Sequence, residues 1–256
     1  GSFITFDLNP YAGSPCIDYA RGLWEQRYSG VVVCGPLAVN DTTIRRIHAS
    51  GSPYLAMGRL DGFPECSCAT VDYELGTYLS TSFLIKRGHT KIAMLKGFEG
   101  FQPGVERQRG YLKALEEAGI EPCDRHVRSV TFESSSIVNM TYRLLLDPEV
   151  TALVDCSATE DGKSIREGAR RAGRVPGKDF EVVSWTFTDN SAVLSEACAH
   201  VWLPVREAAA EGLELLSRWF DGETDEPIKV LYRPTLYERV ENGEISKPQP
   251  LFDLHY

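Results

Sequence analysis

The stretch that decides the fold is residues 71–122, VDYELGTYLSTSFLIKRGHTKIAMLKGFEGFQPGVERQRGYLKALEEAGIEP. Residues 73–86 carry apolar side chains at the spacing of one helix face, and Gly88 stands where a helix C-cap belongs. A short buried strand at residues 91–95 and a second helix at residues 105–118 follow. This order of helix, turn, strand, loop and helix predicts a parallel sheet with helices on both faces.

The loop after the predicted strand is the first candidate for a binding site. Parallel sheets bind ligands at the carboxyl ends of their strands, and residues 96–104 lie at such an end. This loop contains Phe98, and Arg107 stands at the start of the helix that follows. Because a guanidinium group presents five N–H donors in one plane, Arg107 suits a ligand with paired acceptors.

The same alternation continues on both sides of this stretch. We expect further strands at residues 3–8, 30–34, 53–57, 127–132, 152–155, 180–185 and 229–237. We expect further helices at residues 16–27, 41–49, 137–146, 163–172 and 205–220, and Asp41 could cap the second of them. Together these elements predict an α/β fold.

Composition limits the classes of protein to which the chain can belong. Its 256 residues are 43% hydrophobic, which is enough for one large or two small domains. A net charge of -9 argues against nucleic-acid binding by this chain itself, because DNA affinity needs a basic surface. The sequence shows no long apolar run and no secretory signal, so we expect a cytoplasmic protein without a membrane span.

The seven cysteines predict neither a disulfide framework nor a metal site. Their number is odd and their spacing is irregular. Cys66 and Cys68 form a C-x-C pair, which is too close for the usual zinc pair and has no second pair to complete a site. We interpret the cysteines as reduced thiols, several of them buried, and we expect no metal and no cofactor.

Several short motifs occur along the chain in an order that is difficult to produce by chance. In the central stretch they are Val71-Asp72, Gly76, Leu84-Ile85, Arg87-Gly88-His89, Lys91-Ile92-Ala93, Glu106-Arg107, Gly110-Tyr111 and Ala118-Gly119-Ile120. Further on they are Thr151-Ala152-Leu153, Ala172-Gly173, Val175-Pro176, residues 180–183, Pro204-Val205 and Asp221-Gly222-Glu223. Together they resemble the effector-binding core of the LacI/GalR family of bacterial transcription repressors, over roughly residues 29–238.

The resemblance implies two doubly wound parallel-sheet subdomains of the type I periplasmic-binding-protein-like fold. The N-terminal subdomain would comprise residues 1–89 and 205–224, and the C-terminal one residues 90–204 and 225–240, with an extended tail at residues 241–256. The chain would cross between them near residues 87–91, 203–206 and 222–229. The family's first strand–helix unit and its helix-turn-helix domain are expected to be missing from this chain. An alternative alignment treats Asn9-Pro10-Tyr11 as the turn after the family's first strand, but it fits residues 21–33 less well.

The resemblance also implies a ligand between the two subdomains and matches residues to it. Arg107 matches an arginine that holds effector hydroxyls or a carboxylate, Phe132 an aromatic that stacks on the effector, and Asp72 an acid at the edge of the cleft. Arg59 is a candidate for the rim. Each also has a plainer interpretation: a surface arginine, a core phenylalanine, a helix N-cap and a residue of a solvated turn.

Other polar positions of the family are replaced in this chain. Ser157 stands in place of an Asn-Asp pair, Thr186 in place of an aspartate, and Leu203 in place of the polar residue before the last crossover. Trp185 adds aromatic surface nearby. A simple hexose is therefore expected to bind poorly, and both an aromatic sugar platform and a less polar or anionic effector facing Arg107 remain open.

The leading interpretation is the effector-binding and dimerisation core of a cytoplasmic LacI-type regulator. It would bind a small polar ligand, sugar or sugar-like, and would act as a homodimer on operator DNA through the helix-turn-helix that this chain lacks. The alternative is the solute-binding receptor of a transporter, which shares the fold; the lack of a visible export signal argues against it. An enzyme is not expected, because no nucleophile elbow, glycine-rich phosphate loop or H-E-x-x-H motif occurs.

Overall fold

The chain divides into two compact units in a computed structural model. The structure describes residues 3–7, 25, 28–131, 133–157, 162–187, 195–224 and 226–239. Unit 1 gathers the described residues up to Val71, together with residues 100–103 and 204–232. Unit 2 gathers residues 72–99 and 104–203 and the described residues from Arg233 onward.

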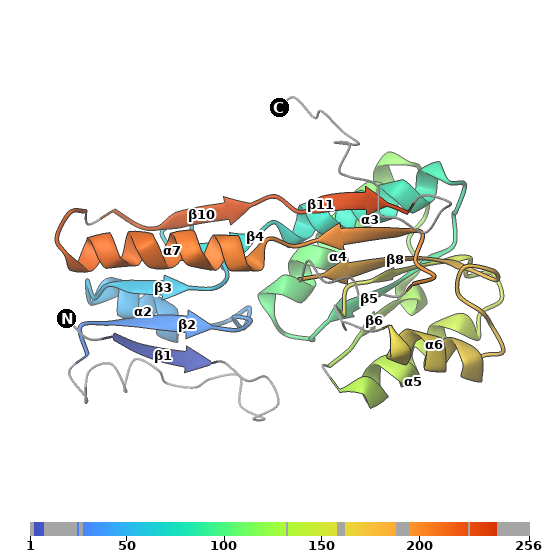
Figure 1. The fold of residues 1–256 in the computed structure, drawn as a ribbon, viewed down its shortest axis with the longest axis horizontal. Coiled ribbons are helices and arrows are strands. Elements are labelled where there is room, and N and C mark those ends of the chain that lie inside the picture. The colour runs from blue at the N-terminus through green and yellow to red at the C-terminus, as the bar shows by residue number, and fades with distance from the viewer. Residues whose placement is uncertain are drawn as a thin grey trace. The chain divides into compact units, whose positions relative to one another are not determined.

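Unit 1 is built on a five-stranded parallel sheet (Figure 1). Across the sheet the strands are β1 (Phe3–Asp7), β2 (Gly30–Cys34), β3 (Tyr54–Ala56), β4 (Cys68–Val71) and β10 (Lys229–Tyr232). Successive strand residues face opposite sides, so Val31 packs with α2 (Thr43–Ala49) and Val32 packs with α7 (Val205–Phe220). The two helices therefore cover the two faces of this sheet.

Unit 2 is built on a six-stranded sheet in which only the edge strand β11 (Thr235–Glu238) runs antiparallel to its neighbour. The remaining strands, in order, are β9 (Ala199–Trp202), β8 (Glu181–Thr186), β7 (Ala152–Asp155), β5 (Ile92–Gly97) and β6 (Val127–Ser129), which the short helix η2 (Asp124–His126) precedes. Helices α5 (Ser134–Leu145) and α6 (Lys163–Arg171) share one core with alternate strand residues such as Val182. Helix α3 (Tyr73–Lys86) contacts β7, β8 and β11, and α4 (Gln102–Glu117) packs on α3 where Gly110 leaves no room for a side chain.

The α/β fold with parallel sheets and helices on both faces is confirmed. Gly88 has a φ of +97° just after α3, as the predicted C-cap requires, and the Asp41 carboxylate accepts hydrogen bonds at the start of α2. The single strand predicted at residues 229–237 is wrong, because β10 and β11 belong to different sheets. Pro234 stands between them, and a proline has no N–H to continue a strand ladder.

The division between the units also falls at other residues than the resemblance implied. The first passage lies at residues 71–72 rather than 87–91, because α3 packs with unit 2. The last lies at residues 232–233 rather than 222–229, and residues 100–103 return to unit 1. The chain passes from unit 2 to unit 1 at residues 203–204. The helix expected at residues 16–27 and the tail at 241–256 lie outside the described residues, Glu25 excepted.

Neither a membrane span nor a metal cluster occurs in the part of the chain that the structure describes. No described helix is both long and apolar enough to cross a bilayer. No group of three or more described His, Cys, Asp or Glu residues could hold a metal ion. The six cysteines in the described segments are thiols, and burial raises the pKa of the Cys66, Cys156 and Cys198 thiols to about 12.

Candidate ligand-binding site

Arg107 lies at the carboxyl edge of the unit 2 sheet, in the part of α4 that belongs to this unit. Its Nη1 donates to the carbonyl oxygen of Lys96, 3.2 Å away near the end of β5. The last residue of that strand, Gly97, has a φ of +94°, and a side chain there would overlap Nη1 of Arg107. The glycine therefore serves both the turn of the backbone and the close approach of the arginine.

Two aromatic rings lie against the Arg107 guanidinium. Its central carbon is 5.0 Å from the ring centroid of Tyr73 and 5.0 Å from that of Trp185. The two rings stack on each other, with centroids 6.2 Å apart and an angle of 11° between their planes. Ring faces attract a cation through their quadrupoles. The arginine is thus held by a backbone carbonyl and two rings, and we call Arg107, Tyr73, Trp185 and Lys96 the Arg107 cluster.

Trp185 is fixed from the side of α3. Its Nε1–H donates to the hydroxyl of Ser80 at 3.1 Å, and a Cβ on Gly76 would meet its ring. Only 1% of the residue is exposed. Trp185, which the sequence offered as aromatic surface near the ligand, is thus a buried ring that lies against Arg107.

Arg107 retains donors that no described residue satisfies. Its Nε is buried and has no hydrogen-bond partner. No described carboxylate oxygen lies within 4.0 Å of a guanidinium nitrogen of Arg107, the limit for an ion pair. A buried donor of a charged group that lacks an acceptor costs free energy. An acceptor supplied from outside the chain would remove this cost.

A buried carboxyl group, that of Asp155, ends the neighbouring strand β7. Asp155 is 2% exposed, and its Oδ1 accepts hydrogen bonds from the backbone N–H and the hydroxyl of Ser157. The hydroxyl of Ser184 lies 3.5 Å from Oδ2. Burial raises the pKa of the Asp155 carboxyl, while hydrogen bonds from Ser157 and Ser184 and the charge of Arg107 oppose the rise. Ser157, a predicted ligand residue, is therefore engaged with this carboxyl group.

The other predicted residues are distributed differently. Asp72 caps α3, because its carboxylate accepts from the backbone N–H of Leu75 at 3.0 Å, so the plainer interpretation of it holds. Thr186 ends β8 and Phe98 follows β5, and both are half-buried. Arg59 belongs to unit 1, where it follows β3. Phe132 lies outside the described residues.

Sequence reasoning missed two members of this region, Tyr73 and Asp155. Tyr73 was counted only as the start of a helix, although an aromatic residue next to the matched acid Asp72 is a signal for the site. Asp155 was counted as the last residue of a predicted strand. An acid that closes the apolar strand ALVD is the signal that marks it.

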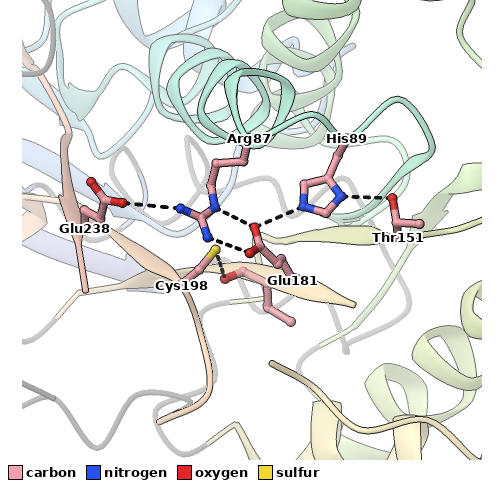
Figure 2. Close-up of polar contacts among 7 residues, drawn as sticks. Arg87, His89, Thr151, Glu181, Cys198 and Glu238 are labelled. Atoms are coloured by element: carbon pink, nitrogen blue, oxygen red, sulfur yellow. Dashed lines mark hydrogen bonds and ion pairs between the residues drawn. The ribbon is translucent and has the colours of Figure 1, made fainter. Parts of the chain in front are cut away.

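A second polar cluster lies at the opposite, amino edge of the same sheet (Figure 2). Nε and Nη2 of Arg87 donate to the two carboxylate oxygens of Glu181 at 2.7 and 2.6 Å, and Nη1 lies 3.5 Å from Glu238. His89 links Glu181, at 3.0 Å from Nε2, to the hydroxyl of Thr151, at 2.9 Å from Nδ1. These hydrogen bonds, chiefly those from Arg87, lower the pKa of Glu181 to about 2. We call these five residues the Arg87 clasp; it joins the end of α3 to the starts of β7 and β8.

Sequence comparison finds one family profile and several regulators that are similar to this chain. The profile described as "Periplasmic binding proteins and sugar binding domain of LacI family" matches residues 4–205. The transcriptional regulator RafR of Escherichia coli is 24% identical, over 87% of this chain and 66% of its own length. The regulator CelR of Thermobifida fusca is 32% identical, over 84% of this chain and 63% of its own. The chain therefore spans just under two thirds of the length of these relatives.

Solved structures give the same result. A CelR–cellobiose complex has a TM-score of 0.72 and 30% identity, covering 85% of this chain and 66% of that one. A regulatory protein of the LacI family from Chloroflexus aggregans has a TM-score of 0.72 and 25% identity, covering 91% and 83%.

Proposed function

The chain belongs to the family of periplasmic binding proteins and LacI-type sugar-binding domains, and from this premise we propose that it is the effector-binding part of a transcription regulator. It would bind a small polar molecule, sugar or sugar-like, and binding would alter the affinity of the regulator for DNA. The relatives named above are regulators and not enzymes, which also favours this function over a transport receptor. The CelR–cellobiose neighbour supports a sugar-like ligand.

The observation that carries the proposal is the state of Arg107. It stands at the carboxyl edge of a parallel sheet, where such folds bind ligands. Its position is fixed by Gly97, Tyr73 and Trp185, so it is oriented before a ligand arrives. Its Nε still lacks an acceptor. Among the other predicted residues, Phe98, Ser157 and Thr186 lie at or next to the ends of strands of the same sheet and are the candidates for further ligand contacts.

The proposal extends to the longer regulator. RafR and CelR are named HTH-type regulators, and this chain corresponds to about two thirds of them. We propose that operator DNA is bound through a helix-turn-helix outside this stretch, since a net charge of -9 does not suit DNA contact here. A homodimer in the cytoplasm would present two such domains to two half-sites. Sedimentation at tens of micromolar, roughly the range of weak dimers, tests the assembly; a monomer would contradict it.

Calorimetry of this chain against a panel of sugars, sugar acids and nucleobases tests the binding function. Arg107→Ala is expected to weaken binding by about 1.5–3 kcal/mol, the scale of a lost hydrogen bond to a charged group. Arg170→Ala is the matched control, because that side chain is 73% exposed on α6 and pairs only with Glu167. Tight binding that survives Arg107→Ala unchanged would show that the site lies elsewhere.

A further inference from the structure

We propose that the effector is an acid whose carboxylate binds the Nε–Nη2 edge of Arg107. This inference rests on the proposed function, because it specifies the ligand of the same site. It follows from which donors of the guanidinium are already used, from its positive charge, and from a second arginine of the same unit that shows the completed arrangement.

The donors of Arg107 divide into a used side and an unused side. Nη1 donates to the Lys96 carbonyl oxygen, and the contacts with Tyr73 and Trp185 involve ring faces rather than lone pairs. Nε is buried without a partner, and Nη2 has none in the described part of the chain. The unpaired donors therefore form one edge of the guanidinium, and their parallel N–H bonds match two oxygens of one planar group.

The Arg87 clasp shows what completes such an edge. Arg87 uses the same two atoms, Nε and Nη2, to hold the two oxygens of Glu181 at 2.7 and 2.6 Å (Figure 2). Among the described residues of unit 2, a carboxylate thus pairs with Arg87 and none pairs with Arg107. A ligand carboxylate at Arg107 would reproduce the geometry found at Arg87.

The positive charge of Arg107 favours an acid over a neutral sugar. Asp155 is 2% exposed and is held by Ser157, so its oxygens are directed to other donors. A ligand carboxylate supplies both the acceptors and a negative charge, whereas sugar hydroxyls supply acceptors without a charge.

The residues at the ends of the neighbouring strands also favour an acid. β7 ends in the buried Asp155, β8 ends in Thr186, and Leu203, which follows β9, is fully buried. Neutral sugars present many hydroxyl donors, and such donors need acceptors from the protein. These three described strand ends offer no exposed carboxylate to accept them, and in a sugar acid such as galacturonate a carboxylate, which needs no acceptor, replaces one of these donors.

Calorimetry with matched pairs tests the inference on this chain. The pairs are galactose with galacturonate, glucose with glucuronate, and cellobiose with cellobionate, and glucose 6-phosphate tests phosphate as the source of the negative charge. One acid is expected to bind about tenfold or more tightly than its neutral partner. Added salt should weaken the binding of the acid and leave the binding of the neutral sugar unchanged, because salt screens the charge.

Variants connect the preference to the arginine. Arg107→Gln should abolish the preference for the acid, and Arg107→Lys should retain part of it, because the charge remains while the planar fork is lost. Arg170→Gln removes one exposed positive charge from the same unit and should leave the preference intact. Melting temperatures of the three variants establish that each is folded.

The outcomes separate this inference from the proposed function. If a neutral sugar binds as tightly as its acid and Arg107→Gln weakens its binding, the inference of an acidic effector is wrong and the proposed function is supported. If glucose 6-phosphate binds more tightly than every sugar acid, the inference that the effector group is a carboxylate is wrong. If no member of the panel binds, both the inference and the proposed small-molecule function are contradicted.

Discussion

Two arginines at opposite edges of the unit 2 sheet differ in the hydrogen-bond acceptors around them. Arg87, at the amino edge, gives two hydrogen bonds to the Glu181 carboxylate and lies 3.5 Å from Glu238. Arg107, at the carboxyl edge, rests on two rings and one carbonyl oxygen and has a buried Nε without an acceptor. Among the described residues, the Arg87 clasp has acceptors for its arginine donors, and the Arg107 cluster lacks an acceptor for Nε. An arginine held in place but left short of acceptors is the better candidate for binding.

The carboxyl groups at the two edges show the same contrast. Hydrogen bonds from Arg87 lower the pKa of Glu181 to about 2, so its charge stabilises the fold at neutral pH. Burial raises the pKa of Asp155, so its charge opposes folding. The carboxyl group at the amino edge therefore stabilises the fold, whereas the one at the carboxyl edge destabilises it. Ionisable groups with such perturbed pKa values are common at functional sites.

Removing the support of the Arg107 cluster should have the largest effect. Trp185→Ala deletes a ring that is 1% exposed and should lower the free energy of unfolding by about 3–5 kcal/mol, the range for buried aromatic residues. Phe187→Ala, next but one in the chain and 39% exposed, should change it by less than about 1 kcal/mol. Urea unfolding measures both. Similar losses in the two variants would mean that Trp185 is not a buried support.

Displacing Arg107 without removing it sharpens the comparison. Gly97→Ala strains a backbone with φ of +94° and places a methyl group against Nη1 of Arg107. Gly100→Ala strains a backbone with φ of +79° where no atom lies within 4 Å, so it is a matched control. Both should lower the free energy of unfolding by about 1–2 kcal/mol. Only Gly97→Ala should also weaken ligand binding in calorimetry; equal binding by the two variants would contradict the assigned role of Arg107.

Much of the fold could be predicted from sequence because it depends on local pattern. Helical spacing in residues 73–86, the apolar run at residues 30–34 and the cap at Gly88 each reflect one element and its own burial. The break between β10 and β11 was missed, since alternation continues through Pro234 and only the partner strands differ. Strand partners are set by contacts distant in sequence, which periodicity does not contain.

The candidate site could be predicted only in part, for the same reason. Arg107 was found through its place in a motif and its position after a strand. That Trp185 supports this arginine depends on Ser80, more than a hundred residues earlier in the chain. The role of Tyr73 depends on the stacking of its ring with Trp185. These contacts arise from tertiary packing, so the place of Tyr73 next to Asp72 can mark it as a site residue but cannot show which ring it stacks on.

The two carboxyl groups should respond to amidation with opposite signs. Glu181→Gln should lower the free energy of unfolding at pH 7 by about 1 kcal/mol, reduced by partial exposure of the pair. Its contribution is present above the usual pKa of about 4.5 and is lost as pH falls toward about 2, so the variant should show a shallower loss in acid. Asp155→Asn should leave stability at pH 7 unchanged or higher, because a raised pKa favours folding only as pH falls through it. Unfolding from pH 7 to 3 measures both, and a loss in Asp155→Asn as large as that in Glu181→Gln would contradict the contrast.

The smallest expected effect compares the two arginines directly. Arg87→Met removes a bidentate ion pair whose side chains are 39% and 27% exposed, so its cost should be about 0.5–1 kcal/mol. Arg107→Met loses cation–π attraction of about 0.5–1 kcal/mol, but it also removes a buried donor without an acceptor. These opposing changes should leave its net effect on unfolding within about 0.5 kcal/mol. Ligand binding should show the reverse order, with Arg107→Met impaired and Arg87→Met close to the unsubstituted chain. If instead Arg107→Met unfolds more easily and binds normally, Arg107 is the structural arginine, and the two edges of the sheet have been assigned the wrong way round.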